Sequence, residues 1–326
     1  MKVSIRDRLE AVGASAWDGL VAASRLRSPF LSWAWQYEWV RTFAADRRLE
    51  IRCVEDGAGS LISILPLYES APGALQLIGG ADVSDYLDLI SLQGREEEAW
   101  MALLQSRTAE HVEWELHTVP EMSPTVAALP PLAAACGLTV SATVEERCPV
   151  LALPSSWETY LARLSGKHRH ELQRKMRRLE RDAPDAHVSF VSAPADIAAR
   201  LGDFLRLHRS SRAGKARVMD EQMERFFRAA LAAFAEREAA RLWFLDTASG
   251  PIAAFVTIEW DGTVGLYNSG FAPERAALSP GVVLLAQLIR DAIGRGRRRF
   301  DFLRGEERYK YEFEPVPEAV YQVRIR

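Results

Sequence analysis

Apolar residues recur along the chain first with a helical period and then with the spacing of strands, and this succession occurs twice. The clearest helix covers residues 220–238, where apolar positions lie three and four residues apart. These positions are Met223, Phe226, Phe227, Ala230, Leu231 and Phe234. Three strand-like segments joined by short turns follow it, at 241–247, 252–260 and 263–271. In the first half, helical patterns at 15–26 and 33–45 likewise precede strand-like segments at 49–54, 61–68 and 75–78.

Each half then continues with alternating helices and strands, so the order of elements repeats after about half the chain. This order predicts an α/β protein (α+β mixed sheets) built from two tandem domains. Each domain is expected to be a mixed, mostly antiparallel sheet flanked by helices. We place the domains at 1–153 and 154–326, with a long helix over 157–181 as the connector. A short helix is predicted at 306–313, and residues 85–90 are predicted to be extended.

Composition narrows the class of protein only a little. The 326 residues are 48% hydrophobic and 26% charged, which is enough apolar material for two cores. The net charge of −3 gives no general argument for a nucleic-acid or membrane partner. Cys53, Cys136 and Cys148 form no disulfide framework and are expected to be reduced thiols. No segment has the length and apolar character of a signal peptide or membrane span, so a cytoplasmic location is expected.

Residues 299–310 read RFDFLRGEERYK, and this run resembles a signature of the CelD/BcsL-like branch of the GNAT acyltransferase superfamily. Three further segments match the same branch. They are SPGVVLL at 279–285, Leu207-His208 followed by Arg212 and Gly214, and DYLD at 85–88. The tandem layout also resembles FemAB-type peptidyltransferases, which use aminoacyl-tRNA donors.

The resemblance implies transfer of an acyl group from acyl-coenzyme A to an amine or hydroxyl, on a small-molecule or a saccharide or cell-envelope acceptor. The donor pyrophosphate is expected at the helix start Ser279-Pro280-Gly281, together with Val282 and Val283, because backbone N–H groups there attract anions. Arg275, in the preceding loop, is expected to assist. The loop departs from the usual GNAT pattern because it carries one glycine instead of two, and a simple helix cap is the alternative.

The catalytic candidates are Asp301, Glu306, Tyr309 and His208. Asp301 lies between two phenylalanines, where burial raises a carboxyl pKa and suits a general base; an ion pair with Arg304 or Lys310 is the alternative. Tyr309 is placed to protonate a leaving thiolate. Glu306 starts the predicted helix and pairs with Lys310 four residues on.

The predicted substrate-binding residues come from both halves of the chain. From the first half we expect Asp85, Tyr86 and Asp88, although a strictly extended segment puts the two aspartates on opposite faces. From the second half we expect Arg212, Tyr267, Asn268, Arg304 and Lys310. The sequence shows no spacing typical of a metal site, so no metal is expected.

Eight lysines and arginines fall between residues 163 and 181. These basic residues are explained by a solvent-exposed helix face. The alternative is that they bind an anionic partner such as tRNA, a lipid head group or an acidic polysaccharide precursor. A FemAB-like aminoacyl-tRNA-dependent transferase therefore remains an alternative function. A non-catalytic scaffold on a GNAT frame is the other, because fold does not imply function.

Overall fold

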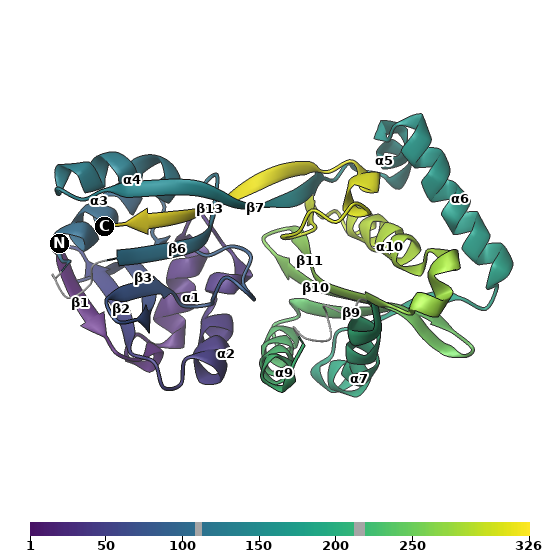
Figure 1. The fold of residues 1–326 in the computed structure, drawn as a ribbon, viewed down its shortest axis with the longest axis horizontal. Helices are drawn as coiled ribbons and strands as arrows, with labels where there is room; N and C mark the ends of the chain where they lie inside the picture. Colours follow the sequence, from purple (N-terminus) through teal and green to yellow (C-terminus); the bar gives the residue numbers. More distant parts are fainter. Residues whose placement is uncertain (108–112, 212–218) are drawn as a thin grey trace. The chain divides into compact units, whose positions relative to one another are not determined.

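The computed structural model describes residues 1–107, 113–211 and 219–326. The chain divides into two compact units (Figure 1). Unit 1 comprises Met1–Arg147 and Glu318–Arg326, and unit 2 comprises Cys148–Pro317. Each unit is a mixed sheet flanked by helices, so the predicted fold class is confirmed.

Unit 1 contains a sheet that is antiparallel except for one parallel pair, β4 with β6. In spatial order its strands are β1 (Lys2–Arg6), β2 (Leu49–Glu55), β3 (Leu61–Ala71), β4 (Ala74–Leu77), β6 (Glu113–Pro120), β13 (Val316–Ile325) and β7 (Val140–Ala152), and β5 (Ile90–Ser91) pairs with β3. Its α-helices are α1 (Ala14–Ala23), α2 (Trp33–Phe43), α3 (Glu96–Gln105) and α4 (Pro124–Ala135). Ser32 caps α2 as its position predicts, since its side chain accepts a hydrogen bond from the Trp35 N–H.

Unit 2 repeats this plan, again with one parallel pair, β11 with β12. Its strand order is β8 (His187–Val191), β9 (Ala240–Thr247), β10 (Gly250–Trp260), β11 (Thr263–Phe271), β12 (Arg299–Asp301) and the last residues of β7. Its α-helices are α5 (Trp157–Arg163), α6 (Gly166–Asp182), α7 (Pro194–Ser211), α9 (Glu221–Ala235) and α10 (Pro280–Gly294). Helices α7 and α9 cover one face of this sheet and α10 covers the other, with α6 packed on α10 (Figure 1).

Two strands cross the division between the halves of the sequence, and we call β7 and β13 the exchanged strands. In unit 1, β13 lies between β6 and β7; at its end, Thr139 and Arg326 exchange two backbone hydrogen bonds of 2.9 Å. In unit 2, residues 150–152 of β7 pair with β12. Each unit therefore uses a strand that sequence order alone assigns to the other half.

Three predicted elements differ in the structure. The helix expected over 157–181 is two helices, because Leu164 is extended and Ser165 starts α6 by accepting a hydrogen bond from the His168 N–H. The helix expected over 306–313 is a loop followed by a short 3₁₀-helix, Lys310–Phe313. Of residues 85–90, predicted to be extended, only Ile90 belongs to a strand, β5.

Gly270 lets α7 lie directly on β11. A Cβ atom at this position would come within 2.4 Å of the His208 backbone nitrogen, which no side-chain rotation relieves. We expect Gly270→Ala to lower the free energy of unfolding by about 3 kcal/mol, as forced overpacking does. Urea unfolding measures this. Gly202→Ala, which lies in α7 and has open space around it, is the control and is expected to stabilise slightly. Equal effects of the two substitutions would contradict the prediction.

Candidate functional site

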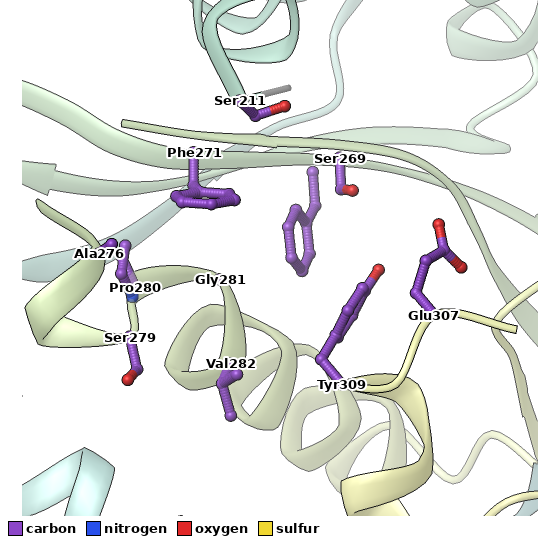
Figure 2. Close-up of a pocket in the computed structure, with 11 residues that line it drawn as sticks. Ser211, Ser269, Phe271, Ala276, Ser279, Pro280, Gly281, Val282, Glu307 and Tyr309 are labelled. Carbon is purple, nitrogen blue, oxygen red and sulfur yellow. The ribbon is translucent and has the colours of Figure 1, made fainter. Parts of the chain in front are cut away.

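A cavity of about 290 Å³ opens in unit 2 at the start of α10 (Figure 2). Its walls come from α7, the strands β10 and β11, the segment leading into α10, and the loop after β12. The lining residues are Ser211, Phe255, Ser269, Phe271, Ala276, Ser279, Pro280, Gly281, Val282, Glu307 and Tyr309. The cavity thus joins an aromatic wall to a helix start and to two polar side chains.

The sheet opens beside this cavity because β11 and β12 part. Their parallel pairing covers only Thr263–Gly265 of β11, whereas β11 continues to Phe271. A bulge interrupts the pairing with β10: Val256 lies opposite Asn268, and the next residue, Thr257, lies opposite Leu266. Such a bulge bends the strand and changes where its backbone groups point. The diverging strands leave room for a ligand to reach the β11 backbone.

The start of α10 is unusually open to an anion. Ser279 adopts a left-handed conformation with φ of 51°, and its side chain makes no capping hydrogen bond. The first turn contains no acidic residue, and Pro280 occupies the first position, where no N–H is needed. Gly281 and Val282 line the cavity, whereas Val283 is buried in the core. The helix dipole and the first amides therefore favour a negatively charged ligand here.

The equivalent helix of unit 1 has the opposite character. Helix α3 begins with Glu96, Glu97 and Glu98, and the Glu96 carboxylate accepts a hydrogen bond of 2.7 Å from the Gly94 N–H. Three acidic side chains in a first turn repel an anion even though the dipole attracts it. Of the two corresponding helix starts, that of α10 is the one suited to phosphate.

The loop after β12 carries Glu307 and Tyr309 into the cavity, facing the start of α10 (Figure 2). Lys310 is buried behind this loop. Its Nζ donates to the carbonyl oxygens of Arg304 and Gly305 at 2.8 and 2.9 Å, and lies 2.9 Å from Glu307 Oε2. These contacts turn the Lys310 ammonium inward.

The predicted ion pair between Glu306 and Lys310 is wrong, because the segment is a loop and Lys310 contacts Glu307 instead. Glu306 is exposed and accepts a hydrogen bond of 2.9 Å from the Tyr311 hydroxyl. It is not among the residues that line the cavity.

The other catalytic candidates lie outside the cavity lining. Asp301 is buried; its Oδ1 accepts a 2.8 Å hydrogen bond from the Leu303 N–H, and its Oδ2 lies 3.3 Å from Arg299. Asp301 therefore forms an ion pair with Arg299, a partner that the prediction did not name. His208 is buried in α7, where its Nδ1 lies 3.0 Å from the Ser269 carbonyl oxygen. A catalytic role for Asp301 or His208 stays a prediction.

The substrate-binding candidates of unit 2 are also spread out. Tyr267 stacks on Phe227, and Asn268 accepts a hydrogen bond from the Ser269 N–H; neither residue lines the cavity. Arg275, which was expected to assist in binding the donor, is exposed on the 3₁₀-helix Pro273–Leu278, next to the cavity residue Ala276. Arg212 lies outside the residues that the structure describes.

A second cavity, of about 220 Å³, lies in unit 1 at the start of α4. Asp88 lines it and is fully buried; Ser123 and Thr125 donate hydrogen bonds to its carboxylate, as does the Leu89 N–H at 2.8 Å. Burial raises the Asp88 pKa to about 6, and the hydrogen bonds oppose this. Asp85 and Tyr86 are buried nearby in the chain but do not line this cavity.

Titration of Asp88 makes its contribution to the free energy of unfolding decrease as the pH rises. Because its folded pKa of about 6 exceeds the unfolded value of 3.8, its contribution to stability is full below pH 4 and is lost as the pH rises to about 6. The shift corresponds to roughly 3 kcal/mol. We expect Asp88→Asn to unfold at higher urea concentration than the wild type at pH 8, with this advantage absent at pH 4. A difference between the two proteins that does not change with pH would contradict this.

Several cavity residues were missed by sequence reasoning. Glu307 was not named as a site residue, although it lies two residues before Tyr309 in the same signature run. Phe255 and Ser269 lie opposite each other on β10 and β11, and this register is visible only in the sheet. Ser211 follows His208 on α7, within a segment already matched to the family.

In residues 1–107, 113–211 and 219–326, no group of three or more His, Cys, Asp or Glu side chains is placed to hold a metal ion. Within the same ranges, no helix combines the length and apolar character needed to cross a membrane.

Residues 166–311 match the family described as acetyltransferase (GNAT) domain. No curated protein matches the chain. Among solved structures, the fold is similar to FemX with a TM-score of 0.65 at 9% identity, covering 99% of this chain and 97% of that one. A Bacteroides thetaiotaomicron protein of unknown function has a TM-score of 0.63 at 14% identity over 99% of both chains. The C-terminal domain of a putative lysylphosphatidylglycerol synthetase from Agrobacterium fabrum has a TM-score of 0.58 at 10% identity, covering 95% and 91%.

The family match and the divergent strands beside α10 define a GNAT domain in unit 2, and such a domain indicates an acyltransferase. The predicted resemblance to GNAT acyltransferases is therefore supported over residues 166–311, and the fold of the chain as a whole is similar to that of FemX.

Proposed function

We propose that this protein transfers an acyl group from acyl-coenzyme A to an amine or hydroxyl of a small-molecule, saccharide or cell-envelope acceptor. The observation that carries the proposal is the cavity at the uncapped start of α10, where β11 and β12 part. Donor pyrophosphate fits the amides of Gly281 and Val282. The apolar walls at Phe255 and Phe271 suit the less polar part of the donor.

The reaction needs a nucleophile, a stabilised oxyanion and a protonated leaving group. The acceptor attacks the thioester carbonyl carbon, and the bond from that carbon to sulfur breaks as the new bond forms. The β11 backbone, reached where the strands part, is the candidate oxyanion donor. Tyr309 lines the cavity and is the proposed source of the proton for the coenzyme A thiolate.

The role of the N-terminal half, residues 1–153, follows from the acidic start of α3. We propose that this half does not bind the donor and either supports the C-terminal half, residues 154–326, or binds the acceptor. The cavity that contains Asp88 is then the place in unit 1 where an acceptor group fits.

Calorimetry and thermal unfolding with acetyl-coenzyme A, longer acyl-coenzyme A species and free coenzyme A test the donor. At 100 times its dissociation constant, a ligand stabilises the folded state by about 2.7 kcal/mol, which gives a clear shift in Tm. Binding of these ligands supports the proposal. If none of them binds and tRNA does, acyl-coenzyme A is not the donor; if neither binds, the scaffold alternative is favoured.

One surface feature favours the second candidate, an aminoacyl-tRNA donor. Helix α6 carries an exposed stripe with successive spacings of three and four residues: Lys167, His170, Arg174, Arg177 and Arg181. The stripe lies about 180° around the helix from the buried Leu172 and Leu179, so it points away from α10. Among the described residues, no ion pair is found for Lys167, His170 or Arg177. Such a basic row fits a phosphate backbone.

The double substitution Lys167→Glu and Arg177→Glu tests this candidate. If tRNA is the donor, the variant binds tRNA more weakly and the salt dependence of binding becomes less steep. The matched control places the same charge changes at Arg206 and Arg225, on the opposite face of the sheet. Equal effects from both pairs, or none from either, would leave acyl-coenzyme A as the proposed donor.

A further inference from the structure

The loop after β12 and the lysine that follows it combine three features that act together. They are the Glu307 carboxylate in the cavity, the buried Lys310 ammonium, and Gly305, which lies against both. We infer that Glu307 takes the proton from the acceptor during acyl transfer, and that Lys310 is the positioning residue that holds Glu307 in place. The inference rests on the proposed function and adds a residue that sequence reasoning did not assign to the site.

The position of Glu307 is the first argument. It lines the cavity together with Tyr309 and Ser269, and Figure 2 labels all three side chains around it. A proton acceptor must lie within hydrogen-bond reach of the attacking group, so a carboxylate in the wall of the donor cavity is a suitable base. Asp301 and Glu306, the other acidic residues of the signature, do not line the cavity.

The contacts of Lys310 are the second argument. The side chain is only 5% exposed, and its Nζ contacts two backbone carbonyl oxygens of the loop as well as the Glu307 carboxylate. A buried ammonium needs several acceptors, and these three join the backbone at Arg304 and Gly305 to the Glu307 carboxylate. The lysine therefore fixes where the Glu307 carboxylate lies.

The positive charge of Lys310 also favours a carboxylate in the donor cavity. An anionic donor and a carboxylate repel each other in a shared cavity, and the repulsion increases as water leaves. The Lys310 ammonium, 2.9 Å from Glu307 Oε2, offsets this negative charge without entering the cavity. The arrangement allows a base and an anionic donor to occupy the same site.

Gly305 makes the arrangement possible. Its φ of 104° is unfavourable for residues with a side chain, and a Cβ atom would lie 2.6 Å from Glu307 Oε2 and 3.3 Å from Lys310 Nζ. Glycine is thus required where the carboxylate and the ammonium meet.

Two proton transfers accompany the movement of the acyl group. The acceptor N–H or O–H proton passes to the Glu307 carboxylate as the bond to the carbonyl carbon forms. Tyr309 gives its hydroxyl proton to the departing thiolate, so coenzyme A leaves as the thiol. Solvent then returns the proton from Glu307 to the Tyr309 phenolate, which restores both groups. One acyl group and one proton have moved, and nothing is oxidised or reduced.

The test compares Glu307→Gln with Glu312→Gln. Glu312 is a matched control, because it also contacts one lysine and is 34% exposed, against 33% for Glu307. Acetyl-coenzyme A binding is measured first by calorimetry; its absence in the wild type would defeat the proposed function itself. Release of free thiol from acetyl-coenzyme A is then followed with water and with hydroxylamine as nucleophiles. We expect Glu307→Gln to bind the donor and to lose ~10²–10⁴-fold in rate, and Glu312→Gln to retain the rate.

A wild-type protein that binds acetyl-coenzyme A but releases thiol no faster than free solution would overturn the assignment of Glu307. An unchanged rate in Glu307→Gln would do the same.

Lys310→Met tests positioning separately. Removing the nearby cation raises the pKa of a carboxyl, so the acidic limb of the rate profile is expected to move to higher pH. Lys310→Arg keeps the charge and is expected to leave that limb near its wild-type position, even if packing lowers the rate. If the acidic limb of the rate profile lies at the same pH in the wild type, Lys310→Met and Lys310→Arg, then Lys310 only stabilises the loop.

Discussion

Gly281→Trp is expected to weaken acetyl-coenzyme A binding at least about 100-fold while the protein remains folded. Gly281 lines the cavity at the first turn of α10, and a Cβ added there points toward Phe255, with 3.9 Å to its Cζ atom. An indole group in this direction fills space that the donor needs and covers the open amides. The helix itself tolerates the change, because Gly281 has no left-handed conformation to maintain.

Calorimetry measures the dissociation constant, and circular dichroism checks the fold. Gly281→Ala is the graded control: its single methyl group meets Phe255 at an ordinary contact distance, so binding should change less than about tenfold. If the tryptophan variant bound acetyl-coenzyme A as the wild type does, the donor would not occupy this cavity.

Cutting the chain between residues 153 and 154 is expected to leave two pieces that do not fold independently. Piece 1–153 lacks β13, which lies between β6 and β7, so its sheet would lose an interior strand. Piece 154–326 lacks residues 150–152, which pair with β12. Buried strand edges without partners carry unsatisfied backbone groups, which are costly. Circular dichroism and hydrogen exchange of each piece check this expectation.

The control restores the missing strand. Residues 1–153 joined through a flexible linker to residues 318–326 contain every strand of unit 1 and should show a cooperative unfolding transition. Residues 148–317, which match unit 2, should likewise be more stable than piece 154–326. Cooperative unfolding of piece 1–153 alone, with the stability of the restored version, would contradict the role of β13.

The sequence predicted the fold well where periodicity was strong. Helix α9 and the strands β9, β10 and β11 were expected from their apolar spacing, and the start of α10 from Pro280 and Gly281. The split between α5 and α6 was missed, because the apolar stripe continues in phase across Ser165 and only the backbone there shows the break. The pairing of the exchanged strands could not be predicted either, since the local sequence pattern does not specify which distant strand a segment pairs with.

The site was predicted in part for similar reasons. Ser279, Gly281, Val282 and Tyr309, which were named from the sequence, line the cavity, because the helix start and the signature run are local features; their roles stay predictions. Glu306 was named instead of Glu307, since the prediction assumed a helix where Gly305 and Lys310 form a loop. In a helix, Lys310 would pair with the residue four positions earlier; in the loop it holds the one three positions earlier.

The exchanged strands also determine when each unit can be completed during synthesis. Domains of a growing chain usually fold in order from the amino terminus. Unit 1 cannot follow this order, because its strand β13 is made after all of unit 2. Until residues 318–326 leave the ribosome, β6 and β7 have no strand between them. Unit 1 therefore finishes folding only after all of unit 2 has been made, and until then the first half depends on avoiding a wrong partner for β6.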